Sequence, residues 1–266
     1  MYYLGLYWEF IKIRLKTMVE YRSNTIWTGI AEACGYTADF LVIWIMISKF
    51  HNIGDWNAYE VIFLYAINLL TYSLSSMFLY RTCNNLSFQI RTGEFDDIIT
   101  KPTNPFLYLC CSGFMYGYYS HISVSIFFIC FCLAKLGVTL SISKIFFLIL
   151  SLIGGALIQG AMNLFTTVPS FWMVKNTALR SLTWSGRNFI EYPISIYHKS
   201  IQIILTVILP FAFISFYPAQ YFLGKSDFLM FHPIFQFLTP VVGVILFALA
   251  YMFWCFGIKH YNSSGS

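Results

Sequence analysis

Charged residues are scarce in this chain, and their scarcity excludes a soluble globular protein. Asp, Glu, Lys and Arg make up 10% of the 266 residues, whereas hydrophobic residues make up 58%. A soluble domain carries about 25% charged residues. The 28 Phe, 19 Tyr and 7 Trp residues add to the apolar character. The composition therefore indicates an integral membrane protein, and the length suits one membrane domain over residues 1–266.

The chain also lacks the short motifs that carry chemistry in many enzymes. There is no phosphate-binding GxxxxGK(S/T) loop, no HExxH or GxSxG motif and no Cys/His cluster with metal-ligand spacing. The 7 Cys residues are odd in number and lie mostly in apolar runs, so we interpret them as small apolar residues. No basic run of the nucleic-acid-binding kind is present. We therefore expect a chain that is not catalytic by itself and holds no cofactor, metal or nucleic acid.

Long apolar runs predict an all-α membrane protein with six transmembrane helices. Each run has about the 20 residues that a helix needs to cross hydrocarbon. The predicted spans are 24–48, 59–80, 106–134, 144–168, 197–216 and 234–257. Pro210 interrupts the fifth run, which continues into a proline- and aromatic-rich segment over residues 211–222. We expect broken, re-entrant helices there, with their backbone satisfied by protein or water.

The residues before the first span predict an amphipathic helix. Apolar side chains recur at steps of three and four, and the charges fall on another face. The apolar set is Leu4, Trp8, Ile11, Leu15 and Met18, and the charged set is Glu9, Lys12, Lys16 and Glu20. Residues 1–23 therefore suit a helix that lies in the membrane interface. Because charges interrupt its apolar positions, no cleavable signal peptide is expected.

The distribution of basic residues predicts the orientation. In this six-span scheme, 12 of the 16 Lys and Arg residues fall on the side of the N-terminus. They include Lys175, Arg180 and Arg187 in a connection over residues 171–196. The four on the other side are Lys49, Lys135, Lys144 and Lys225. Cytoplasmic loops carry the excess of positive charge, so both termini and this connection are expected in the cytoplasm.

A dense polar segment interrupts the apolar chain between the second and third spans. Gly93 opens it, Pro102 and Pro105 close it, and Glu94, Asp96 and Asp97 lie between them. Acidic residues in a first turn favour a short helix, and Lys101 suits the opposite end. Phe95, Ile98 and Ile99 would give that helix an apolar stripe that could dock into a groove of a soluble partner. The alternative is an ordinary capped loop helix without a partner.

Polar residues inside the predicted spans are the other candidates for function. Glu32 and Asp39 are seven residues apart, on one face of the first span. Ionisable groups in a span usually face the bundle interior or a water-filled path. The alternative is that Glu32 reaches the interface while Asp39 pairs with another span. Gln159 and Asn163 suit hydrogen bonds between helices, with small residues beside them for close packing. We place Glu32, Asp39 and Asn163 on a candidate translocation path.

Three groups of motifs resemble those of bacterial ABC exporter permeases of the ABC-two membrane type, in a subgroup long known only as a domain of unknown function. The first is Gly93-Glu94-Phe95-Asp96 with Lys101-Pro102-Thr103-Asn104-Pro105. The second is Tyr192-Pro193-Ile194-Ser195-Ile196-Tyr197, continuing to Ile208-Leu209-Pro210-Phe211 and Tyr217-Pro218-Ala219. The third is Gly257-Ile258-Lys259-His260-Tyr261 with Ser263-Ser264-Gly265. One departure is Thr103, where the family often has an aliphatic residue.

The resemblance implies the permease subunit of an exporter of a peptide, drug or lipid-like substrate. It implies a dimer with a second permease copy or a paralogue, in the bacterial cell membrane. Separate cytoplasmic ATPase subunits would bind ATP and Mg. A coupling loop over residues 81–105 would contact them through Gly93, Glu94, Phe95, Asp96, Ile98, Lys101 and Pro102. The alternative is an ATP-independent ion-coupled transporter or channel built on Glu32 and Asp39, and a membrane-embedded enzyme is disfavoured because no catalytic set clusters.

Overall fold

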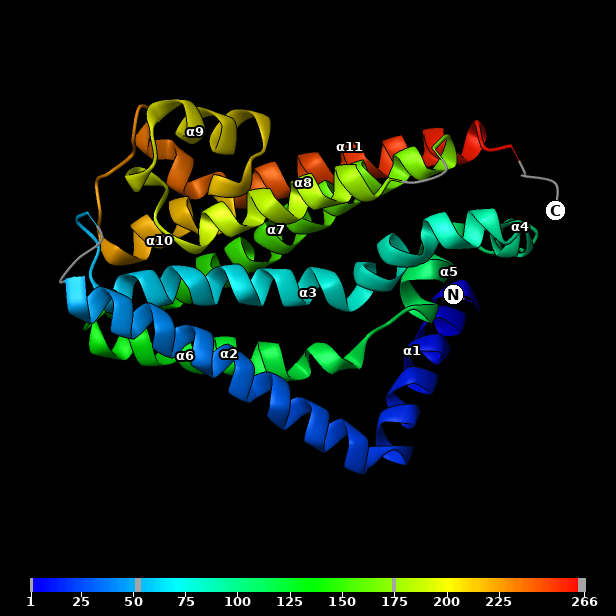
Figure 1. The fold of residues 1–266 in the computed structure, drawn as a ribbon, viewed down its shortest axis with the longest axis horizontal. Coiled ribbons are helices and arrows are strands. Elements are labelled where there is room, and N and C mark those ends of the chain that lie inside the picture. The colour runs from blue at the N-terminus through cyan, green and yellow to red at the C-terminus, as the bar shows by residue number, and fades with distance from the viewer. Residues whose placement is uncertain (1, 51–53, 174–175, 263–266) are drawn as a thin grey trace.

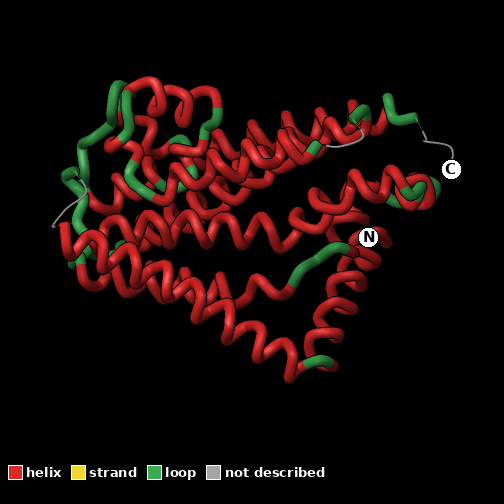
Figure 2. Tube along the Cα trace, in the orientation of Figure 1, coloured by secondary structure: helices red, strands yellow, loops and turns green. Residues whose placement is uncertain are grey.

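The computed structural model describes residues 2–50, 54–173 and 176–262, and every regular element in these ranges is helical (Figure 2). The α-helices are α1 (Tyr2–Glu20), α2 (Arg22–Phe50), α3 (Ala58–Arg91), α4 (Glu94–Ile99), α5 (Pro105–Ser112), α6 (Tyr119–Lys135), α7 (Ile142–Thr167), α8 (Thr177–Asn188), α9 (Lys199–Ile203), α10 (Phe216–Leu223) and α11 (Thr239–Lys259). The 3-10 and π segments are η1 (Tyr116–Tyr118), η2 (Val168–Phe171), η3 (Phe189–Glu191), η4 (Ile194–Ile196), η5 (Ile204–Ile208), η6 (Phe211–Phe213) and η7 (Pro233–Phe237). The predicted all-α membrane fold is confirmed.

The long helices run between two ends of the bundle, which we call the α4 end and the α10 end (Figure 1). Five segments are long and apolar enough to cross a membrane by themselves. They are Arg22–Met46, Ala58–Arg91, Tyr116–Lys135, Ile142–Phe171 and Thr239–Lys259. Four of them correspond to predicted spans with shifted ends. The third prediction, 106–134, is corrected, because the chain breaks at Gly113 and α5 is a separate short helix at the α4 end.

Helix α3 is the centre of the bundle. Of the five candidate spans it is the most buried, with 83% of its most apolar 18-residue stretch buried inside the protein. Asn57 and Glu60 form a capping box at its start, which satisfies backbone N–H groups that a helix leaves open. Inside the helix, Asn68 Oδ1 accepts a hydrogen bond of 3.1 Å from Gln159 Nε2 of α7. The prediction that Gln159 joins helices is therefore confirmed.

Glycines allow α7 and α11 to approach backbone to backbone. A Cβ atom at Gly154 would lie 2.7 Å from Cα of Pro240, and one at Gly243 would lie 2.8 Å from Cα of Gly154. Both distances are shorter than real Cβ contacts, so neither position tolerates a side chain without moving a helix. A Cβ atom at Gly155 would lie 2.7 Å from Cγ2 of Thr71 of α3. The small residues predicted to allow close helix approach in the fourth span do so.

The fifth crossing differs from the prediction. Asn176, before α8, donates to the Thr166 carbonyl at 3.0 Å, at the α4 end of α7. Arg187 lies over Tyr72, midway along α3, and Ile196 lies beside Gly54 at the α10 end. The connection predicted over 171–196 therefore traverses the bundle as α8, η3 and η4 instead of staying at one end. The polar composition of this segment did not predict a crossing. Lys175, which was assigned to the same connection, lies outside the described residues.

The apolar run predicted as the fifth span forms a re-entrant hairpin instead. Segments 199–208 and 211–223 meet at Pro210 with a bend of 80°. Lys199 lines a cavity with Gly54 and Asp227, so both arms of the hairpin return to the α10 end. At the tip, the Phe213 carbonyl accepts a 2.7 Å hydrogen bond from Thr239 Oγ1. The broken helices after Pro210 are confirmed, and the span at 197–216 is corrected to the first arm of this hairpin.

Two boundaries near the α4 end also change. Helix α3 continues to Arg91, so the predicted loop 81–105 is helical in its first half and only Thr92–Asn104 leaves the bundle around α4. Helix α1 has the predicted length, and Arg14 Nε donates to the Ser112 carbonyl of α5 at 2.7 Å. Trp8 and Leu15 stay exposed on α1. Its place in the membrane interface stays a prediction.

Candidate functional site

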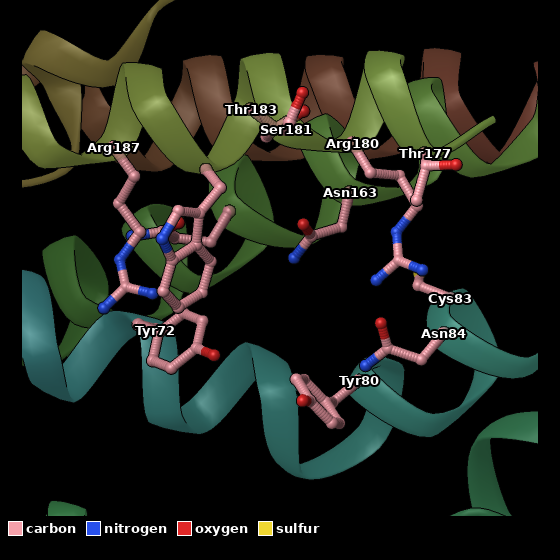
Figure 3. Close-up of a pocket in the computed structure, with 12 residues that line it drawn as sticks. Tyr72, Tyr80, Cys83, Asn84, Asn163, Thr177, Arg180, Ser181, Thr183 and Arg187 are labelled. Atoms are coloured by element: carbon pink, nitrogen blue, oxygen red, sulfur yellow. The ribbon is translucent and has the colours of Figure 1, made fainter.

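A cavity of about 340 Å³ opens between α3, α7 and α8 (Figure 3). Its walls combine aromatic rings, neutral amides and hydroxyls, and two guanidinium groups. The lining residues are Tyr72, Tyr80, Cys83, Asn84, Gln159, Asn163, Thr177, Arg180, Ser181, Thr183, Trp184 and Arg187. Volumes of about 300–1,000 Å³ are typical of small-molecule sites. The cavity is therefore a candidate substrate site beside the centre of the bundle.

Helix α8 supplies the charged wall of this cavity. Thr177, Arg180, Trp184 and Arg187 follow one another at steps of three and four, which places them on one helical face. That face points toward α3 across the cavity (Figure 3). None of the described residues that line the cavity is acidic. The site therefore carries positive charge that no carboxylate in its own lining balances.

Arg187 is held by aromatic rings. Its guanidinium carbon lies 3.4 Å from the ring centroid of Tyr72 and 5.1 Å from that of Trp184. Stacking of a guanidinium on aromatic rings is favourable and fixes its plane. Its Nε and Nη1 atoms are buried, yet neither finds a hydrogen-bond acceptor among the residues that the structure describes. Buried donors of this kind are normally satisfied, and a ligand in the cavity would meet these two atoms only after a shift of the side chain.

Arg180 and Arg187 are not among the site residues predicted from the sequence, because the predicted topology places both in a cytoplasmic connection. A signal was present in the spacing of the α8 face, where Trp184 lies between Arg180 and Arg187 at steps of four and three residues. Hydropathy could not reveal it, since a crossing segment packed against protein need not be apolar. Asn163, predicted on the translocation path, does line this cavity.

The other two residues of the predicted path lie elsewhere. Glu32 Oε2 accepts a 2.7 Å hydrogen bond from Ser120 Oγ and lies 3.5 Å from His121 Nδ1, so it joins α2 to α6. It lines a separate cavity of about 100 Å³. Asp39 is exposed on α2. Glu32 and Asn163 thus line two different cavities, and Asp39 lines neither of them.

Helix α4 forms a second candidate site at its own end of the bundle. Gly93 has φ of +74°, a left-handed conformation that glycine adopts without steric cost, and it turns the chain sharply after α3. Phe95 is completely buried, with ring centroids 5.3 Å from those of Phe171 and Tyr261. Ile98 is buried beside it. The predicted apolar stripe therefore faces the bundle and anchors the helix.

The outward face of α4 is polar. Glu94 and Asp97 are exposed, and so are Lys101 and Pro102 after the helix, while Asp96 is half-buried. Acidic residues in the first turn complement the helix dipole. Lys101 Nζ donates to Tyr108 Oη of α5 at 2.7 Å and lies over the same ring. A partner that docks here would contact charged side chains. Phe95 and Ile98, which were predicted to contact the partner, instead hold α4 against the bundle.

The turn between α4 and α5 is fixed from three directions. Asn104 Oδ1 caps α5 by accepting from the backbone N–H of Phe106 at 3.0 Å. Its Nδ2 donates to Tyr251 Oη of α11, and its backbone N–H donates to Tyr7 Oη of α1. Three helices far apart in the sequence therefore hold this turn. A force on α4 would reach α1, α5 and α11 together.

The sequence of this chain matches the model of one protein family. The family described as ABC-2 family transporter protein matches residues 34–265, which include every helix from α3 to α11 and most of α2. A comparison with curated proteins gives no match. The match agrees with the apolar helices that can cross a membrane. This chain therefore belongs to the ABC-2 transporter family and is a multi-pass membrane permease component of ABC transport.

Proposed function

We propose that this chain is the permease subunit of an exporter that moves a peptide, drug or lipid-like substrate out of a bacterial cell. Separate cytoplasmic ATPase subunits would bind ATP and Mg, and a second permease copy or a paralogue would complete the membrane part. Both termini would then lie in the cytoplasm, together with the α4 end. The family supports the ATPase partnership.

The observation that carries the proposal is the construction of α4. A helix of six residues is anchored by Phe95 and Ile98 and presents Glu94 and Asp97 outward. Because the anchor is buried among aromatic rings and the following turn is held by three helices, movement of α4 would move the bundle. Rigid-body movement of packed helices is a common way to transmit binding energy over a distance. We assign the coupling role to the outward residues Glu94, Asp97, Lys101 and Pro102, with Gly93, Phe95, Asp96 and Ile98 holding them in place.

The alternative of an ATP-independent transporter or channel has less support. It needs a path along Glu32 and Asp39, but Glu32 bonds to Ser120 of α6 and the cavity that it lines does not include Asp39. Membership of the ABC-2 family also favours an ATP-driven mechanism.

The test is co-purification with candidate ABC ATPase subunits co-expressed with this chain, followed by ATPase rates in nanodiscs. Asp97→Arg should lower recruitment about tenfold or more, since small interfaces depend on a few residues worth about 1–3 kcal/mol each. Asp55→Arg, an exposed charge reversal at the α10 end, is the matched control and should recruit normally. Full recruitment and full substrate stimulation in Glu94→Arg and Asp97→Arg would refute the coupling role of α4.

A further inference from the structure

The charged residues in the lining of the cavity beside α8 are all basic. Arg180 and Arg187 both line it, and its described lining includes no carboxylate. The ion pairs that the structure shows elsewhere join Lys12 to Glu9, Lys225 to Glu60 and His121 to Glu32, so none of them involves these arginines. Glu191, one turn after Arg187 and outside the cavity lining, interacts electrostatically with that arginine and offsets part of its charge. Removing charge from bulk water without a full partner is costly. An anionic ligand would offset that cost.

The arginine geometry suits a ligand rather than a structural role. Tyr72 stacks on Arg187 at 3.4 Å, while Nε and Nη1 remain buried without acceptors in the described chain. Guanidinium groups form strong charge-assisted hydrogen bonds to phosphate and carboxylate oxygens. Arg180, two turns earlier on the same face, brings a second guanidinium to the cavity, and Asn84 and Asn163 add neutral donors. The cavity therefore offers an anionic group two guanidinium groups along one face of α8.

The surroundings indicate that this anionic group belongs to an amphipathic molecule. Trp184 and Tyr80 line the same cavity and remain 57% and 41% exposed, so an apolar surface adjoins the arginines. The cavity of about 340 Å³ has room for a headgroup but not for a long chain as well. A tail would have to leave the cavity along this aromatic surface.

We infer that the cavity between α3, α7 and α8 binds a phosphate or carboxylate group of an amphipathic molecule, with Arg180 and Arg187 as its ligands. The inference rests on the proposed function for the identity of that molecule as substrate, but the binding itself requires no ATPase. Tyr72 acts as a positioning residue, because it touches the guanidinium of Arg187.

The experiment measures equilibrium binding to the full chain in phosphatidylcholine nanodiscs, without ATPase. The probe is tritiated dioctanoyl phosphatidic acid in a scintillation proximity assay, and uncharged dioctanoylglycerol is the matched competitor. Phosphatidic acid should compete at least about tenfold better than dioctanoylglycerol, as expected for charge-assisted hydrogen bonds. Competition by inorganic phosphate would assign the site to the anion alone, and its failure to compete would assign the site to the whole amphiphile.

Variants separate the cavity from general surface charge. Arg180→Gln and Arg187→Gln should each weaken binding about tenfold, and Arg187→Lys should recover part of the loss because it restores the charge without the planar stack. Arg22→Gln, an exposed arginine at the start of α2, should bind like the wild type. If Arg187→Gln fails to fold, Arg180→Gln still tests the site. Equal binding of the two lipids, or an equal loss in Arg22→Gln, would overturn the inference. Recruitment of the ATPase by α4 is measured separately, so either proposal can fail alone.

Discussion

Phe95 is the residue that converts the polar turn after α3 into a fixed element. Its ring lies against Phe171, Trp254 and Tyr261, so it ties α4 to η2 and to the end of α11. The sequence suggested the opposite orientation, with Phe95 outward in a groove of a partner. An apolar residue in a short helix can serve either purpose, and only the neighbouring aromatic residues decide between them.

Replacing Phe95 should therefore act mainly by lowering the stability of the permease, and only indirectly on docking of a partner. Phe95→Ala removes a fully buried ring and should destabilise the α4 end by about 3–5 kcal/mol. Asp97→Ala, two residues later on the exposed face, should change stability by less than about 0.5 kcal/mol. Thermal unfolding of the purified permease, followed by size exclusion, measures both. Equal melting temperatures for Phe95→Ala and wild type would contradict the inward orientation.

At the scale of elements, the contact between α7 and α11 depends on the absence of side chains. Membrane helices lack a hydrophobic driving force for association, so close packing through small residues contributes much of their attraction. Gly154 and Gly243 face each other where backbone meets backbone. Gly35 of α2, by contrast, has open space where a Cβ would be placed.

Gly154 and Gly35 provide a matched pair of substitutions. Gly154→Ala should destabilise the bundle by about 1–3 kcal/mol, because its Cβ would collide with the backbone of Thr239 and Pro240, which cannot rotate away. Gly35→Ala should leave stability unchanged or raise it by up to about 1 kcal/mol, since alanine favours a helix. Thermal unfolding again supplies the measurement, and a loss of stability in Gly35→Ala as large as in Gly154→Ala would show that close approach is not the cause.

At the scale of the molecule, the path of α8 sets the number and direction of crossings. It begins at the α4 end and delivers the chain through η4 to the α10 end, where the re-entrant hairpin follows. Residues near the two ends of this segment should therefore lie on opposite sides of the membrane. The sequence-based prediction of 171–196 as one cytoplasmic connection places them on the same side.

Cysteine labelling distinguishes these two topologies. In a cysteine-free background, Ile196→Cys should react with an impermeant thiol reagent in intact cells, and Thr177→Cys should react only after the cells are opened. Both positions are exposed in the structure. Protection of both cysteines in intact cells would restore the cytoplasmic connection and remove α8 from the membrane.

Much of this architecture could be predicted from the sequence, for identifiable reasons. Apolar runs of about 20 residues locate α2, α3, α6, α7 and α11, because lipid demands apolar surface over that length. Gly93 and the acidic residues after it locate α4. Hydropathy could not locate α8, since its arginines face a protein cavity, or show that the run at 197–216 turns back at Pro210. Those features depend on contacts with α3 and α7 that no local pattern records.

The polarity of α8 also has a consequence for how the chain is assembled during synthesis. Placing each arginine at the centre of a lipid bilayer costs about 2.5–3.5 kcal/mol on insertion scales. Segment 177–196 is therefore poorly suited to leave the translocation channel for lipid on its own. Helices α3 and α7 precede it in the chain, and Tyr72, Gln159 and Asn163 offer it a polar wall. The order of the helices along the chain thus prepares a protein surface before the segment that needs it is made.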